Sequence, residues 1–203
     1  MITAIYLAAG SSRRMRKAKL SMDLNQSKVG DLALSVILHS NVIDYVIVVV
    51  NQQDNLEWIS KSNMARLDSG SGEIIVCPEA ARGQSYSLKK GFEIAVTRGA
   101  DKILICLADQ PFITEKLLET LAITEWDEKD DFIASSHHEI VKPPILFRRE
   151  VYSKVRKLEG DVGAKRLIQK GELYGKKIEF SEEKLFYDID TEEDYFRILE
   201  RRD

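Results

Sequence analysis

Short apolar runs alternate along this chain with longer segments in which apolar residues recur at helical spacing. The apolar runs are typical of buried strands, which we expect near residues 3–7, 45–50, 73–76, 102–107, 132–135 and 145–147. The periodic segments predict helices over residues 31–39, 56–66, 85–96, 115–123, 151–158 and 192–201. This alternation indicates an α/β protein, a three-layer sandwich in which helices cover both faces of a mostly parallel sheet.

The pattern also predicts one helix start and two loops. Thr191, followed three residues later by Asp194, predicts a capping box at the start of the last helix. The stretch DSGSG over residues 68–72 predicts a flexible surface turn, and residues 125–131 predict a charged loop. Neither loop shows residues arranged for chemistry.

The composition fits one substantial hydrophobic core. The chain has 203 residues, 44% of them hydrophobic, and no linker-like stretch, so we expect residues 1–203 to form one domain. The net charge of -3 argues against general nucleic-acid binding. The first apolar run is too short for a signal peptide or a membrane span, so we expect a cytoplasmic protein without a membrane partner. Cys77 and Cys106 end apolar runs, and we expect them to be small buried side chains without a disulfide.

The turn after the first predicted strand carries the strongest chemical signal. Its apolar residues end at Ala8, Ala9 and Gly10, and the basic segment SSRRMRKAK follows over residues 11–19. Backbone amides and several cations at the end of a strand suit a polyphosphate. The spacing matches neither a Walker loop nor a dinucleotide-binding loop, because both need more glycines. A solvated basic loop, or a nucleic-acid patch, is the alternative interpretation.

Two acidic segments are the next candidates. Asp109 comes just after the strand of residues 102–107, where a carboxylate would hold Mg²⁺ against phosphates at the mouth of the sheet. Its alternative role is to cap the helix near Thr114 or to turn the chain. Asp188 and Asp190 point the same way if their segment is extended, so both could face one cation. Alternatively, Asp190 only favours the positive end of the last helix.

A polar loop over residues 81–91 leads into a predicted helix. Gly83 permits the turn, and Ser85 or Ser87 could either cap the helix or meet a base or ribose with its hydroxyl.

We give less weight to other polar and aromatic residues. His137, His138 and Glu139 are adjacent on a segment expected to be extended, with no third His or Cys nearby, so we expect no zinc site there; Trp58 and Trp126 are interpreted as packing residues.

The ordered set of motifs resembles the MobA-like nucleotidyltransferases, and most closely the molybdenum cofactor cytidylyltransferase branch, which includes accessory proteins of xanthine dehydrogenase. The segments that carry the resemblance are LAAGSSRRM at 7–15 with Lys19, GQSYSLKKG at 83–91, LADQP at 107–111, PPILF at 143–147, LEGDVGAKRLI at 158–168 and DIDTEEDY at 188–195. The resemblance implies the Rossmann-like fold of nucleotide-diphospho-sugar transferases, of the GT-A type. It also implies Mg²⁺ as the cofactor and, because LAAG occurs with DQP, CTP as the nucleotide.

The resemblance implies that the first loop and its lysine hold the triphosphate, that residues 83–91 lie beside the base and that the Asp of DQP binds Mg²⁺. We therefore expect Arg14, Lys19 and Asp109 to be catalytic. We expect Asp109 and Asp190 to hold the metal ion. The acceptor is expected to face Pro143, Pro144 and Asp161. The expected nucleotide-binding residues are Leu7, Ala8, Ala9, Gly10, Ser12, Arg13, Arg14, Lys19, Gly83, Gln84, Ser85, Ser87, Asp109 and Gln110.

The chain departs from the family pattern at two places. Arg16 stands where the family usually has Gly, so a side chain occupies a position of close backbone approach. Lys142 and Pro143 stand where the family tends to have a Gly and a His or Asn before the Pro of its PVLF segment. Because that segment faces the acceptor in the family, this departure falls on the acceptor side of the expected site.

The leading hypothesis is Mg²⁺-dependent transfer of CMP from CTP to the terminal phosphate of molybdopterin or molybdenum cofactor, with release of pyrophosphate. No covalent enzyme intermediate is needed, and catalysis rests on positioning and electrostatics. The partners would be CTP, a phosphorylated pterin acceptor and, transiently, a molybdenum hydroxylase under maturation. The alternatives are transfer to another phosphate acceptor, such as a sugar or polyol phosphate, and a non-catalytic chaperone that carries a nucleotide-bearing cofactor.

Overall fold

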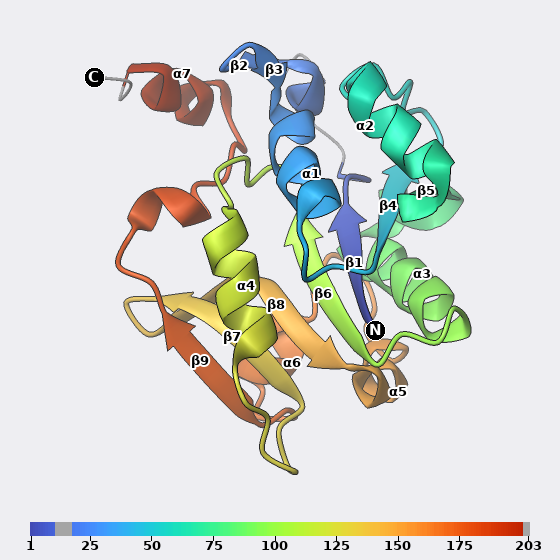
Figure 1. The fold of residues 1–203 in the computed structure, drawn as a ribbon, viewed down its shortest axis with the longest axis vertical. Helices are drawn as coiled ribbons and strands as arrows, with labels where there is room; N and C mark the ends of the chain where they lie inside the picture. The colour runs from blue at the N-terminus through green and yellow to red at the C-terminus, as the bar shows by residue number, and fades with distance from the viewer. Residues whose placement is uncertain (11–17, 201–203) are drawn as a thin grey trace.

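The computed structural model describes residues 1–10 and 18–200. Within them, a seven-stranded sheet runs in the order β5, β4, β1, β6, β8, β7, β9 (Figure 1). Its strands are β1 (Ile2–Leu7), β4 (Tyr45–Asn51), β5 (Gly72–Cys77), β6 (Lys102–Leu107), β7 (Phe132–His137), β8 (Ile140–Arg148) and β9 (Gly175–Glu179). Neighbouring strands are parallel except around β8, which is antiparallel to both β6 and β7. A short hairpin, β2 (Asp23–Leu24) and β3 (Ser27–Lys28), stands apart from this sheet.

Helices cover both faces of the sheet, so the expected three-layer α/β fold is confirmed. In Figure 1, α1 and α4 lie on one face, and α3, α5 and α6 lie on the other. The helices are α1 (Val29–His39), α2 (Lys61–Arg66), α3 (Gln84–Thr97), α4 (Glu115–Ile123), α5 (Tyr152–Val155), α6 (Lys165–Gln169) and α7 (Glu192–Glu200), with short turns η1 (Lys19–Ser21), η2 (Leu67–Ser71), η3 (Pro78–Arg82), η4 (Arg149–Val151) and η5 (Glu183–Phe186). None of the described helices is long and apolar enough to cross a membrane.

The central strand β1 is buried on both faces, and each face packs into a separate hydrophobic core. Ala4 and Tyr6 are fully buried in the core beneath α1 and α4, whereas Ile5 is fully buried in the core beneath α3. This is the alternation expected of a strand covered on both faces. At Gly91, α3 approaches so closely that a Cβ would lie 2.5 Å from Ile5 Cγ2. The sheet is therefore held at a fixed distance from the helix that begins beside the candidate site.

The predicted elements are confirmed apart from a few boundaries. The helix expected over residues 56–66 begins only at Lys61, because the Asp54 carboxylate accepts hydrogen bonds from Leu56 N and Trp58 Nε1 and fixes a turn there. The helix expected over residues 151–158 is reduced to α5 after η4. The prediction of a surface turn over residues 68–72 is wrong at Gly72. This residue is buried at the start of β5, close to the carbonyl oxygen of Val46.

Local capping and burial agree with the sequence. Thr191 Oγ1 accepts from Asp194 N at 3.1 Å, and Asp194 Oδ2 accepts from Thr191 N at 3.0 Å, so the predicted capping box is confirmed. Both cysteines are buried, and burial raises the pKa of the Cys106 thiol. Trp58 is buried as expected.

The segment around His137 differs from its prediction. His138 and Glu139 have positive φ values of 49° and 64° and form the tight turn between β7 and β8, so they are not part of an extended segment. The His137 ring nitrogen Nδ1 lies 2.8 Å from the carbonyl oxygen of Phe180.

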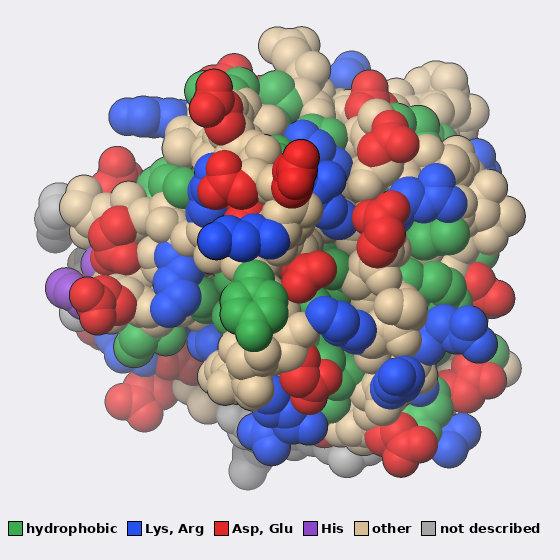
Figure 2. Space-filling model, turned by 90° about the horizontal axis from the view of Figure 1, so that it is seen from below, with side chains coloured by type: hydrophobic (Ala, Val, Ile, Leu, Met, Phe, Trp, Pro, Cys, Tyr) green, Lys and Arg blue, Asp and Glu red, His purple; other side chains and the backbone are tan. Residues whose placement is uncertain are grey.

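Charge on the lower face of the molecule is mixed. Figure 2 looks at the molecule from below, toward the edge where β1, β4 and β6 begin, and shows Lys and Arg interspersed with Asp and Glu. The residues discussed below lie at the opposite edge, where these strands end.

Candidate active site at the carboxyl edge of the sheet

Lys19 joins two carboxylates that are far apart in the sequence. Its ammonium group donates to Asp109 Oδ2 at 2.6 Å and to Asp190 Oδ1 at 3.2 Å. The Lys19 side chain is only 11% exposed, against 23% for Asp109 and 47% for Asp190. The fold therefore assembles one cation and two carboxylates, which we call the lysine-carboxylate cluster.

The sheet explains why the members of this cluster meet. Asp109 follows β6, and the bond from Ala108 N to the carbonyl of Leu7 continues the β1 pairing into the turn. Ile189 is fully buried, and its N–H donates to the carbonyl oxygen of Asp109 at 3.0 Å. This bond brings the segment before α7 across the end of β6. Asp109 does not cap α4, because Thr114 does so by accepting from Leu117 N.

The cluster keeps Lys19 charged. Burial alone would lower the pKa of Lys19, but the charges and hydrogen bonds of Asp109 and Asp190 outweigh it, and the net shift is upward. A protonated ammonium group thus balances carboxylates that would otherwise repel each other at the end of the sheet.

Asp188 takes a different partner from Asp190. Gln110 Nε2 donates to Asp188 Oδ1 at 2.8 Å, whereas Asp190 contacts Lys19. Asp188 lies in a recess, and the pKa of its carboxyl is raised first by burial and then by the charge of Asp109. Among the described residues, the two carboxylates therefore have different hydrogen-bond partners.

A cavity of about 340 Å³ opens beside the cluster, and we call it the carboxylate cavity. It is lined by Leu7, Ala9, Gly10, Lys19, Ala80, Ala81, Arg82, Gly83, Gln84, Ser87, Leu107, Asp109, Asp161 and Asp190. Most of the predicted nucleotide-binding residues within the described chain are among them. Arg82 is a cation that the sequence analysis did not select, although it lies in the loop considered there.

Some predicted residues lie elsewhere. Ser85 is fully buried, lines neither this cavity nor the next one, and its hydroxyl has no hydrogen-bond partner among the described residues. Ala8 is also buried and does not line the carboxylate cavity. Ser12, Arg13 and Arg14 lie outside the described residues, as does Arg16.

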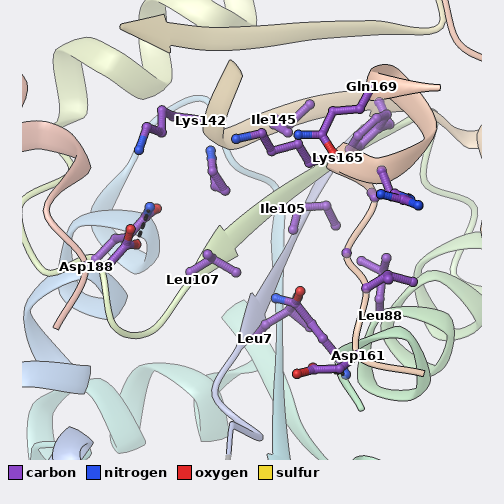
Figure 3. Close-up of a pocket in the computed structure, with 18 residues that line it drawn as sticks. Leu7, Leu88, Ile105, Leu107, Lys142, Ile145, Asp161, Lys165, Gln169 and Asp188 are labelled. Carbon is purple, nitrogen blue, oxygen red and sulfur yellow. Dashed lines mark hydrogen bonds between the residues drawn. The ribbon is translucent and has the colours of Figure 1, made fainter. Parts of the chain in front are cut away.

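A second cavity of about 370 Å³ adjoins the first and shares Leu7, Gln84, Leu107 and Asp161 with it. We call it the lysine cavity because Lys142 and Lys165 line it (Figure 3). The predicted acceptor residues Pro143 and Asp161 line this cavity. Pro144 does not line it; Pro144 is buried, and its carbonyl oxygen accepts from Ser135 Oγ. Sequence reasoning did not select Lys165 or Asp188 as acceptor-side residues, although both lie in motifs that it singled out.

The segment after α5 accepts hydrogen bonds from the first backbone amides of α3. Asp161 Oδ1 accepts from Gln84 N at 3.2 Å, and the Gly160 carbonyl oxygen accepts from Ser85 N at 3.2 Å. These bonds satisfy amides that a helix start leaves without intrahelical partners. Gly83 has a φ of 129°, and a Cβ there would lie 2.3 Å from the backbone carbon of Gly160. Gly83 is therefore required for this close approach.

We expect Gly83→Ala to lower the stability by about 3 kcal/mol, because it adds both backbone strain and a clash with backbone. Thermal or urea unfolding measures this loss. Gly99→Ala is the matched control, since Gly99 also has a positive φ, of 83°, but has no atom within 4 Å of its added Cβ. Equal losses in the two variants would contradict the importance of the Gly83–Gly160 contact.

Comparison with known proteins agrees with this geometry. The charged cluster and the two joined cavities lie at the carboxyl ends of the central strands, where α/β sheets commonly bind ligands. Residues 4–176 match the MobA-like NTP transferase domain, and the chain belongs to this family, as the sequence resemblance predicted. It is a nucleotidyltransferase.

The relatives span nearly the whole chain. Purine catabolism protein PucB of Bacillus subtilis (strain 168) is 34% identical over 195 residues, which is 96% of this chain and 94% of PucB. The crystal structure of the Mycobacterium tuberculosis rv0371c homolog from mycobacterium sp. strain JC1 has a TM-score of 0.77 at 25% identity and covers 98% of this chain and 95% of its own. The 4-diphosphocytidyl-2C-methyl-D-erythritol synthase of Anaerococcus prevotii DSM 20548 has the same fold, with a TM-score of 0.70 at 19% identity, covering 98% and 96%.

Proposed function

We propose that this nucleotidyltransferase transfers CMP from CTP to the terminal phosphate of a pterin cofactor, with Mg²⁺ as the metal ion, and so supports the maturation of a molybdenum hydroxylase. The observation that carries the proposal is the lysine-carboxylate cluster in the carboxylate cavity, which adjoins the lysine cavity. One cavity offers Gly10, Lys19 and Arg82 to a triphosphate, and the other has a largely apolar floor suited to a ring system. The family and the similarity to a purine catabolism protein support this choice of reaction.

Asp109 and Asp190 fit a role as magnesium ligands. Both are hard oxygen donors, and they already hold a positive charge between them in the form of the Lys19 ammonium. Among the described residues, no group of three or more Asp, Glu, His or Cys side chains is placed to hold a metal ion. Two carboxylates agree with the usual Mg²⁺ site in such enzymes, where substrate phosphates and water complete the coordination. When bound, the ion would supply positive charge to the triphosphate.

In the proposed reaction, an oxygen of the acceptor phosphate attacks the α-phosphorus of CTP. The bond from that phosphorus to the bridging oxygen breaks, and pyrophosphate leaves with the bonding electrons. Lys19 would stabilise negative charge on the triphosphate, as would Arg14. Asp161 and Gln84 lie at the boundary of the two cavities, where the reacting phosphates would meet. Catalysis would then come from positioning and charge, without a covalent enzyme intermediate.

We expect CTP to be preferred over GTP and ATP by about tenfold or more, because the Ala9 methyl group reduces the room for a purine. Ala9 is 6% exposed and lines the carboxylate cavity. Steady-state kinetics with each nucleotide measures the preference, and Ala9→Gly should narrow it. Equal turnover of CTP and GTP by the wild-type protein would contradict the assignment.

A screen of nucleoside triphosphates against acceptors, scored by pyrophosphate release, tests the function. The proposal requires release with CTP and molybdopterin together and none with CTP alone. Release only with a sugar or polyol phosphate would replace the pterin as acceptor. Tight binding of nucleotide without release for any acceptor would indicate a carrier instead of an enzyme.

A further inference from the structure

The lysine cavity has an apolar floor and a cationic rim. Its floor consists of side chains from β1, α3, β6 and β8, namely Leu7, Leu88, Ile105, Leu107, Ile145 and Phe147. Figure 3 shows Lys142 and Asp188 at one end of the cavity and Lys165 and Gln169 along its edge, with Ile105 and Leu107 between. An apolar floor of this kind suits a flat ring, whereas a polyhydroxylated sugar would need polar partners there.

The two lysines start from well-anchored backbone. The buried Ser135 hydroxyl lies 2.8 and 2.9 Å from the carbonyl oxygens of Lys142 and Pro144, between which its single hydrogen is shared, and so it anchors β8 on both sides of Pro143. Lys165 begins α6, just after Asp161, which is bound to the start of α3. Both side chains therefore enter the cavity from fixed positions.

Neither the Lys142 nor the Lys165 ammonium is paired directly with a carboxylate of the described residues, although Asp188 lies in the same cavity. Both residues are half-buried. The pKa of Lys165 is lowered by burial first and then by the charge of Lys142, with Asp188 opposing these effects. Two ammonium groups that repel each other at the edge of one cavity favour an anion between them.

The end of the lysine cavity at Lys142 and Asp188 adjoins the lysine-carboxylate cluster. Asp188 lies two residues before Asp190, and Gln110, which binds Asp188, follows Asp109. An anion held by the two lysines would therefore lie next to the place where the triphosphate is proposed to bind.

We propose that Lys142 and Lys165 bind the phosphate monoester of the acceptor while the apolar floor binds its planar ring. This inference rests on the proposed function and adds the residues that select and position the attacking phosphate. The lysines act by binding and orienting the attacking group, and no proton transfer is assigned to them.

Binding of a pterin pair tests the inference without turnover. The probes are 6-hydroxymethylpterin phosphate and 6-hydroxymethylpterin, which are fluorescent and differ only in the phosphate. We expect the wild-type protein to prefer the phosphorylated probe by about tenfold or more, and the double variant Lys142→Gln/Lys165→Gln to lose this preference. Lys165→Arg should retain it. Lys177→Gln, on exposed β9, is the matched control and should behave like wild type.

The same variants separate this inference from the proposed function. In transfer assays the glutamine variants should raise KM for the acceptor about tenfold each while KM for CTP and the melting temperature stay near wild type. Equal wild-type affinity for the two probes, or an unchanged preference in the double variant, would overturn the inference. If the wild-type protein shows the phosphate preference but transfers no CMP, the proposed function fails and the phosphate site stands.

Discussion

Asp109→Asn is expected to reduce the rate of nucleotidyl transfer about a hundredfold or more, while the melting temperature stays close to that of the wild type. The substitution keeps the shape of the side chain but removes the charge that contacts Lys19 at 2.6 Å and that would bind Mg²⁺. Pyrophosphate release at saturating CTP, acceptor and Mg²⁺ measures the effect.

Two further variants test whether the loss of activity is specific to Asp109. Asp190→Asn should reduce the rate by a smaller factor, because Asp190 lies farther from Lys19 and is more exposed than Asp109. Asp101→Asn is the control, since Asp101 is exposed and lies just before β6, at the opposite edge of the sheet. If Asp109→Asn kept wild-type activity, the metal and catalytic roles assigned to Asp109 would be wrong.

Lys19→Ala is expected to weaken CTP binding by about tenfold to a hundredfold, because it removes a charge-assisted contact with the triphosphate. It should also cost about 2 kcal/mol of stability, since Asp109 and Asp190 then face each other without a cation, although their partial exposure limits this cost. Isothermal titration with CTP and urea unfolding measure the two effects, and the protein should still fold.

Lys28→Ala is the matched control for this variant. Lys28 pairs with Asp23 at 2.8 Å, but both side chains are exposed. Its loss should change stability by less than about 0.5 kcal/mol and leave CTP affinity unchanged. Wild-type CTP affinity in a folded Lys19→Ala protein would assign the triphosphate contact to Arg14 or Arg16 instead.

The interior of the fold was predictable because its strands are continuous apolar runs between helical segments. The strand β6 has the bounds that the pattern predicts, and the others differ by a few residues. The edge strand β9 was missed, because GKKIE is short and half-exposed and so lacks an apolar run. The helix α6 was missed for a similar reason, since five residues are too few to show a helical period.

The part of the candidate site that lies at the ends of neighbouring strands was predictable from the sequence. Asp109 and the turn after β1 meet because β1 and β6 are neighbouring parallel strands. The position of Asp190 depends on the Ile189–Asp109 backbone bond, and no local pattern encodes that bond. Lys142 lies on β8, which pairs antiparallel with β6, and Lys165 lies at the start of α6. The two lysines line one cavity only through this tertiary arrangement, which no local sequence pattern encodes.

The most direct test of the account uses CTP labelled with ³²P at its α-phosphate, incubated with the protein, Mg²⁺ and molybdopterin. The account predicts that the label moves to the pterin product, with one pyrophosphate released for each labelled product and no label on the protein. Label that remains in CTP or appears only in free CMP, or label that becomes covalently attached to the protein, would contradict it.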